Sequence, residues 1–203
     1  RAQINPQPNS APALVDWTET KHALLERCGI NKIFELADNL DVAFLSAGGI
    51  EGITTSYRLG HINEADRQSL IAAGAVGDLL YNFISEDGEL VDHNVNTRVI
   101  SVGIDRLKNA TDRVLISGGK EKVKVILGCL KLVKPTVFIT DEFTAKAMLL
   151  SKGWIDDGST YKALPHSPLW ALYIGRDAYE CRLGTCQRLL SRRRPIWHSC
   201  DGN

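Results

Sequence analysis

Short apolar runs alternate with helical segments along most of this chain, and this alternation limits the folds open to it. The runs at 42–45, 99–102, 114–116 and 136–140 are rich in Val, Ile and Phe and are too short to be typical helices. Helical spacing marks the segments 64–73, 122–132 and 142–150. Strands that alternate with helices at such intervals predict βαβ units, so we expect an α/β fold with a mostly parallel sheet flanked by helices.

Local patterns refine this expectation. The unbroken apolar run 42–45 is typical of a parallel strand that is covered on both faces. We expect a short strand at 13–15, a helix through 22–27 that Asp16 or Thr18 caps and Gly29 ends, and a second helix at 33–40. Asn63 is expected to cap the 64–73 helix.

Composition excludes several classes of protein. The 203 residues carry 24 basic and 24 acidic side chains, so overall charge gives no reason to expect binding to nucleic acid or to a membrane surface. We find no apolar run long enough to cross a bilayer and no apolar leader at the start. The five cysteines form no metal-type pair, and their odd number fits reduced thiols. We therefore expect a cytoplasmic protein with no metal and no cofactor.

The last quarter of the chain has a different texture. Residues 155–203 hold three of the five cysteines and the basic run 192–194, and their periodicity is weak. We expect residues 1–154 to form one domain. The segment 155–203 is a divergent tail, for which we consider an extra lobe, a disordered end or the product of a shifted reading frame.

Two glycines and two lysines follow one predicted strand at 117–122, Ser-Gly-Gly-Lys-Glu-Lys. Glycines let a backbone approach an anion, amides at a helix start point toward it, and a lysine adds positive charge. The spacing is not that of a Walker A loop. This pattern predicts a phosphate site, although a tight connection with a solvated Lys122 would give the same letters.

Other polar groups also fall near the carboxyl ends of predicted strands, where open α/β sheets bind ligands. Lysine and amides would hold an anion, whereas carboxylates would accept hydrogen bonds from hydroxyls, which together suit a phosphorylated sugar or polyol. Each member has a structural alternative: Asp141 as a helix cap, the Gly48-Gly49 pair as a turn, and Asp78 as a partner of a buried amide. The candidate effector-binding residues are Gly48, Gly49, Glu51, Asp78, Gly118, Gly119, Lys122 and Asp141.

Catalytic motifs are lacking. The sequence contains no Ser-His-Asp order, HExxH or kinase motif, and the adjacency of Asp92 and His93 does not by itself make an acid–base pair. We therefore name no catalytic residue.

Seven phrases in order resemble the effector-binding domain of the SorC family of bacterial transcriptional regulators, which are sometimes grouped with DeoR-type repressors. Their spacing matches that family over residues 11–152, and they lie at 41–49, 57–60, 72–78, 88–93, 96–100, 117–122 and 140–145. The resemblance implies a fold similar to ribose-5-phosphate isomerase and glucosamine-6-phosphate deaminase, without isomerase activity. It also implies that Lys122 meets the phosphate, that Asp78 meets sugar hydroxyls, that Glu51 lies on another wall, and that the protein forms dimers or tetramers.

The chain departs from the family pattern in several places. Family members carry an N-terminal helix-turn-helix, which nothing here resembles, so operator DNA would be contacted only through a motif absent from this chain. The family domain begins earlier, with a strand and a Gly/Ser/Thr-rich loop, so we expect this domain to be truncated at its N-terminus. Ala47-Gly48-Gly49 replaces the usual Gly-Ile-Gly, and the tail after 154 does not match.

The sequence therefore predicts the effector-binding domain of a regulator that senses a phosphorylated sugar or polyol and controls a carbohydrate operon. One alternative is a phosphosugar isomerase or deaminase of the same fold, because fold does not settle function. Another is a truncated product without a working site.

Overall fold

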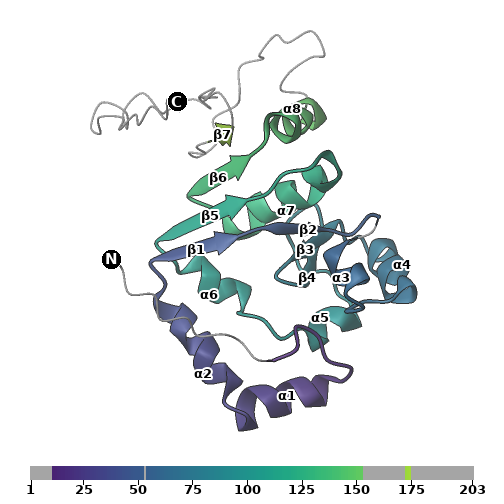
Figure 1. Ribbon diagram of the computed structural model, residues 1–203, viewed down its shortest axis with the longest axis vertical. Coiled ribbons are helices and arrows are strands. Elements are labelled where there is room, and N and C mark those ends of the chain that lie inside the picture. The colour runs from purple at the N-terminus through teal and green to yellow at the C-terminus, as the bar shows by residue number, and fades with distance from the viewer. Residues whose placement is uncertain (1–10, 53, 153–171, 175–203) are drawn as a thin grey trace, which may run out of the picture.

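Four parallel strands and a separate three-stranded antiparallel sheet form the framework of the computed structural model (Figure 1), which describes residues 11–52, 54–152 and 172–174. The predictions for residues 1–10 and for nearly all of the 155–203 tail lie outside these residues. The strands are β1 Val42–Leu45, β2 Ala47–Gly49, β3 Gly77–Leu79, β4 Asn82–Ile84, β5 Asp112–Ile116, β6 Val137–Thr140 and β7 Leu172–Ile174.

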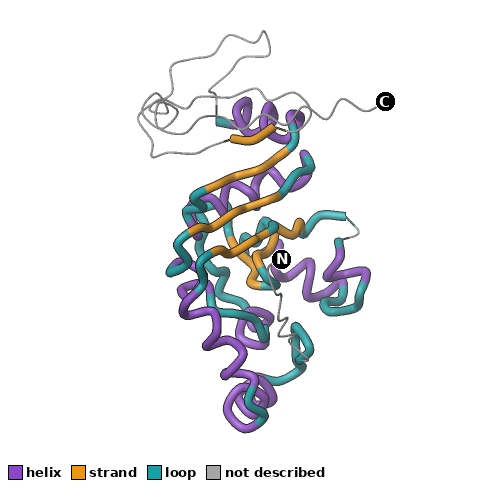
Figure 2. The backbone as a smooth tube through the Cα atoms, turned by 60° about the vertical axis from the view of Figure 1, so that its left-hand side comes forward, coloured by secondary structure: helices purple, strands orange, loops and turns teal. Residues whose placement is uncertain are grey.

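Helices connect these strands, as the alternating pattern predicts. Both views place α1 and α2 at one end of the molecule and α8 at the other (Figures 1 and 2). The helices are α1 Thr18–Arg27, α2 Ile30–Glu35, α3 Thr55–Arg58, α4 Glu64–Ala72, α5 Asn94–Arg98, α6 Ile104–Lys108, α7 Val123–Val133 and α8 Glu142–Ser151, with 3-10 turns η1 Leu36–Asn39 and η2 Lys120–Lys122.

The larger sheet has the strand order β1-β5-β6-β7, and all its pairs are parallel. One face packs against α7, because Leu45, Leu115 and Phe138 share a buried cluster with Ile126 and Cys129 of that helix. The α/β class and the mostly parallel sheet are therefore confirmed. Burial of this apolar face is the main stabilising contribution of the layer.

The opposite face of the same sheet is partly open among the described residues, which corrects one prediction. Val42 and Phe44 of β1 are 41% and 71% exposed, and Ile116 of β5 is 43% exposed. The run 42–45 was expected to be covered on both faces because all four residues are apolar. Alternation along the strand instead buries Ala43 and Leu45 and leaves the other two uncovered.

The smaller sheet is a feature that the sequence did not indicate. Strand β2 follows β1 after one residue and pairs antiparallel with β3, which forms a hairpin with β4. Gly48 and Gly49 therefore lie within a strand, which excludes the turn that was considered as their structural alternative. The pairing places Gly48 opposite Asp78.

Several element boundaries also differ from expectation. Residues 13–15 and 99–102 form no strands; they meet through a single antiparallel bridge between Leu14 and Val99. The predicted helix 33–40 is split into α2 and η1. Trp17, not Asp16 or Thr18, is the N-cap of α1 and makes no side-chain cap bond. The Asn63 cap of α4 is confirmed, with a reciprocal bond from Asp66.

Candidate functional site

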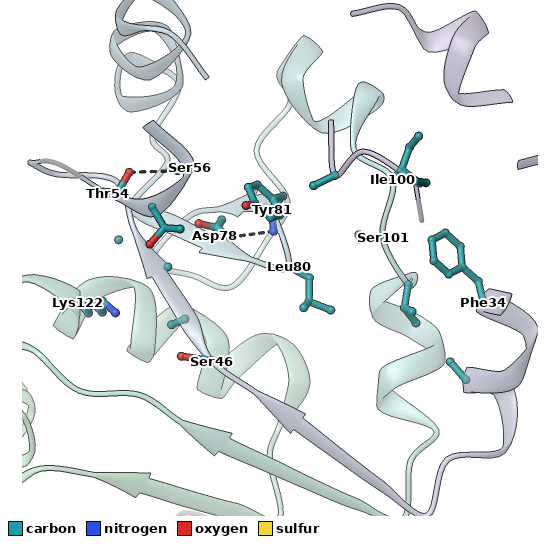
Figure 3. A pocket seen from close by; sticks show the side chains of 18 of the residues that line it. Phe34, Ser46, Thr54, Ser56, Asp78, Leu80, Tyr81, Ile100, Ser101 and Lys122 are labelled. Atoms are coloured by element: carbon teal, nitrogen blue, oxygen red, sulfur yellow. Dashed lines mark hydrogen bonds between the residues drawn. The ribbon is translucent and has the colours of Figure 1, made fainter. Parts of the chain in front are cut away.

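A cavity of about 940 Å³ is lined by residues from the N-terminal helices and from segments next to the strands of both sheets. Its walls come from α2 and η1, the β1–β2 junction, α3, the β3–β4 turn, residues 100–102 and η2. Figure 3 shows Asp78, Lys122 and most of the labelled polar side chains on one side of the cavity, and Phe34 and Ile100 on the other, with Leu80 between them. The volume is within the range of small-molecule sites.

Asp78 is the buried acid of this cavity. It is only 9% exposed, and its Oδ2 accepts a hydrogen bond from the backbone N–H of Tyr81 at 2.8 Å. Burial raises the pKa of Asp78 to about 6, while the Tyr81 amide and the charge of Lys122 act in the opposite direction. The alternative considered for Asp78, a hydrogen bond to a backbone amide, is therefore confirmed. The same carboxylate also lines the cavity.

Lys122 reaches the cavity from the end of η2, one residue before α7 begins. It lies beside β2, since a Cβ placed on Gly49 would be 3.7 Å from Lys122 Cγ. Glu121 lines the cavity next to it, and Glu51, which is exposed, lines it after β2. The cavity thus combines one ammonium group with three carboxyl groups.

Five predicted residues therefore meet at this cavity, and three do not line it. Strand β2 runs between the β3–β4 hairpin, which carries Asp78, and η2, which carries Lys122. The predicted residues in the cavity walls are therefore Gly48, Gly49, Glu51, Asp78 and Lys122. Tertiary pairing brings them together from three separate stretches of sequence.

Gly118, Gly119 and Asp141 form a neighbouring cluster at the start of α8, contrary to the single crevice that we expected. Asp141 is the N-cap of α8: it accepts from the Thr144 amide at 2.9 Å and from the Thr144 hydroxyl at 2.6 Å. The Gly119 N–H donates to Asp141 at 3.2 Å and to the Thr144 hydroxyl at 2.7 Å. This amide is thus already bonded within the protein, and the cap bonds lower the pKa of Asp141.

Sequence reasoning missed several lining residues. Among the polar ones, Ser46, Thr54, Thr55, Ser56, Tyr81, Ser101 and Glu121 all line the cavity. The Thr54 hydroxyl caps α3 by accepting from the Tyr57 amide, so a capping signal was available there. Nothing local marks Tyr81, because it stands in the mostly apolar run 79–84, which carries no recognisable binding motif.

Among the described residues, His93 does not form an acid–base pair with its neighbour Ser69. His93 Nδ1 accepts the Val95 amide, so in the neutral ring the proton is on Nε2, 2.9 Å from the Ser69 hydroxyl. Ser69 in turn donates to the Asp66 carbonyl, so this ring cannot take the proton of that hydroxyl. His61 packs edge-to-face on Tyr81, with ring centroids 5.2 Å apart.

Within 11–52, 54–152 and 172–174, no cluster of three or more His, Cys, Asp or Glu side chains could hold a metal ion. None of the helices in these same ranges has the length and apolar character needed to cross a membrane.

Comparisons with known proteins converge on one family. A family model described as "Putative sugar-binding domain" matches residues 1–150. The deoxyribonucleoside regulator of Bacillus subtilis is 28% identical over 147 residues, which cover 72% of this chain and 47% of that protein. The chain spans about half the length of the curated relatives it matches.

Solved structures agree. A DeoR family transcriptional regulator from Listeria monocytogenes superposes with a TM-score of 0.66 at 27% identity, covering 70% of this chain and 58% of that one. The full-length sorbitol operon regulator SorC from Klebsiella pneumoniae gives a TM-score of 0.62 at 26% identity, covering 68% and 45%.

Proposed function

The chain belongs to the family of sugar-binding domains found in SorC- and DeoR-type transcriptional regulators, and from that membership we propose that it binds a phosphorylated sugar or polyol as a regulatory effector. The observation that carries this proposal is the position of Asp78 and Lys122, which line one cavity on either side of β2. The lysine would hold the phosphate and the carboxylate would accept hydrogen bonds from hydroxyls.

The geometry supports a division of labour within the cavity. Lys122 stands at the start of α7, where the first backbone amides of a helix and a cation favour an anion. Asp78 is buried behind Gly48, so only a ligand that enters the cavity can reach it. A ligand with a phosphate at one end and hydroxyls at the other fits both groups.

Regulation would follow from ligand linkage. An effector that binds one arrangement of an oligomer more tightly than another shifts the population of the two arrangements. We propose a dimer or tetramer in the cytoplasm. The relatives in question are regulators about twice as long as the matched segment, and we propose that operator DNA is contacted by a part outside this chain.

We propose no catalytic role for the cavity. Proton abstraction from a sugar carbon needs a base within reach of it. The Ser69–His93 pair is wrongly protonated for this task and does not line the cavity. The carboxyl groups that line the cavity, Glu51, Asp78 and Glu121, are its candidate bases. The relatives that this chain matches are transcriptional regulators, however, which does not favour the phosphosugar isomerase or deaminase alternative.

A thermal-shift screen tests the proposal. The chain would be heated with sugars and polyols, each supplied with and without its phosphate. A ligand that binds only the folded state stabilises it by about 2.7 kcal/mol at a hundredfold excess over Kd. A shift that requires the phosphate supports the proposal, whereas a cooperative melt that no phosphorylated sugar or polyol shifts contradicts it.

A further inference from the structure

Two consecutive non-glycine residues in the turn between β3 and β4 have a positive φ, which places them in the left-handed region of backbone conformation. Leu80 has a φ of 53° and Tyr81 a φ of 64°. Two-residue hairpin turns of this kind normally use Asn and Gly, because other side chains crowd the backbone there. The third such residue among those described is Lys134, which has a φ of 44° and lies at the end of α7.

Surrounding contacts hold the strained turn in place. The Tyr81 amide donates to Asp78, and the Asn82 side chain donates to the carbonyls of Leu79 and Leu80 at 3.1 Å each. Asn82 also donates to the Ser101 hydroxyl at 2.9 Å. Strain that surrounding contacts enforce is typical of ligand sites, and the inference runs from the observed conformation to a function.

The turn places the Tyr81 ring in the cavity. The side chain lies next to Asp78 (Figure 3), and the edge-to-face contact with His61 fixes the ring plane at 81° to the imidazole. Within the described residues no hydrogen bond involves the Tyr81 hydroxyl, so it is available to a ligand. Partial burial and the Asp78 charge raise the pKa of Tyr81, which keeps this hydroxyl protonated at neutral pH.

Building on the proposed function, we infer that Tyr81 is a specificity-determining residue that favours ring-closed sugar phosphates over open-chain polyol phosphates. A closed sugar ring presents a continuous face of C–H groups that packs flat on an aromatic ring, with its hydroxyls directed to the side. An open-chain polyol has no such face and loses more rotational freedom on binding. The neighbouring Asp78 then accepts hydrogen bonds from hydroxyls at the edge of the same sugar.

Matched ligands and variants test this inference by calorimetry. The ligands are glucose 6-phosphate with sorbitol 6-phosphate, and ribose 5-phosphate with ribitol 5-phosphate; each pair keeps the carbon count and the phosphate but differs in ring closure. The variants are Tyr81→Gly, Tyr81→Phe and Lys134→Gly. The last relieves the same kind of backbone strain at an exposed position that does not line the cavity.

We expect wild type to prefer the ring-closed member of the pair that it binds. Tyr81→Gly should weaken that ligand about tenfold and its open-chain partner less than twofold, while Tyr81→Phe stays within about threefold of wild type. Because glycine tolerates the turn, the melting temperature of Tyr81→Gly should not fall. Lys134→Gly should leave every affinity unchanged.

Results that would overturn the proposed function can be distinguished from results that would overturn only the role of Tyr81. If wild type binds none of the four phosphates and no other phosphorylated sugar or polyol of the thermal-shift screen, the proposed function is overturned and this inference with it. If wild type binds but prefers the open-chain ligand, or if Tyr81→Gly weakens both members of a pair equally, the inference alone is overturned. A large loss of melting temperature in Tyr81→Gly would also overturn it, because the residue would then act as a structural support.

Discussion

A Cβ atom placed on Gly48 would collide with the carboxylate of Asp78, which faces it across the β2–β3 pair. No real Cβ approaches an oxygen so closely, so either the carboxylate or the strand would have to move. The glycine therefore does more than continue the strand: it leaves the space in which the buried acid stands.

Gly48→Ala should consequently disturb ligand binding more than folding. We expect at least a tenfold loss of affinity for the phosphorylated effector that the thermal-shift screen identifies, and a loss of about 1–3 kcal/mol in the free energy of unfolding from overpacking. Calorimetry and urea unfolding measure the two effects. Gly103→Ala is the control, because a Cβ there meets nothing within 4 Å. Equal effects of the two substitutions would contradict the role given to Gly48.

Asp78 should make stability depend on pH. Its pKa is about 6 in the folded protein against an ordinary 3.8, so ionisation is disfavoured by folding. The stability that the protonated acid contributes is fully present below about pH 4 and is lost as the pH rises through 6. At pH 7 the ionised group costs about 3 kcal/mol relative to its protonated form.

Asp78→Asn should therefore be more stable than wild type at pH 7 by up to about 3 kcal/mol, and the difference should vanish near pH 4. Urea unfolding from pH 4 to 7.5 measures this. Asp16→Asn, which changes an exposed carboxylate, should follow the wild-type curve throughout. A stability gain that stays constant across this range would show that the charge of Asp78 is not its source.

Lys122→Ala should abolish most binding of the phosphorylated ligand while leaving the fold intact. Loss of one charge-assisted hydrogen bond lowers affinity by roughly 10- to 100-fold. The matched control is Lys124→Ala, which removes an exposed lysine from the same region of α7. If the affinity of Lys122→Ala stays within twofold of wild type, the phosphate does not lie against this lysine.

Asp141→Ala should affect stability rather than binding. The variant loses the cap of α8 and one of the two acceptors of the Gly119 amide, so we expect a loss of about 1–2 kcal/mol in the free energy of unfolding. Asp141→Asn keeps a capping oxygen and should recover most of this loss. A tenfold loss of effector affinity in Asp141→Ala, with the helix intact by circular dichroism, would show that Asp141 takes part in effector binding.

Sequence periodicity was sufficient for the class of fold but not for its layers. Alternating apolar runs predicted the strands β1, β5 and β6 and the helices α7 and α8, because the length and spacing of apolar residues distinguish strands from helices. It failed for β2, β3 and β4, which are three residues each; β2 and β3 contain glycine, and β3 also contains aspartate. Such strands exist because of their partners, which local propensity does not record.

For the candidate site too, the sequence was sufficient for some residues and not for others. Lys122, Asp78 and the Gly48-Gly49 pair could be named from residue type and position, because an anion or hydroxyl site needs cations, carboxylates and a bare backbone. Only the tertiary structure separated Asp141 and Gly119 from them, since their bonds to Thr144 satisfy each other at the start of α8. Only the tertiary structure showed that the β3–β4 turn places Tyr81 in the cavity, because a left-handed φ on a tyrosine is set by the packing around it and not by its own preference.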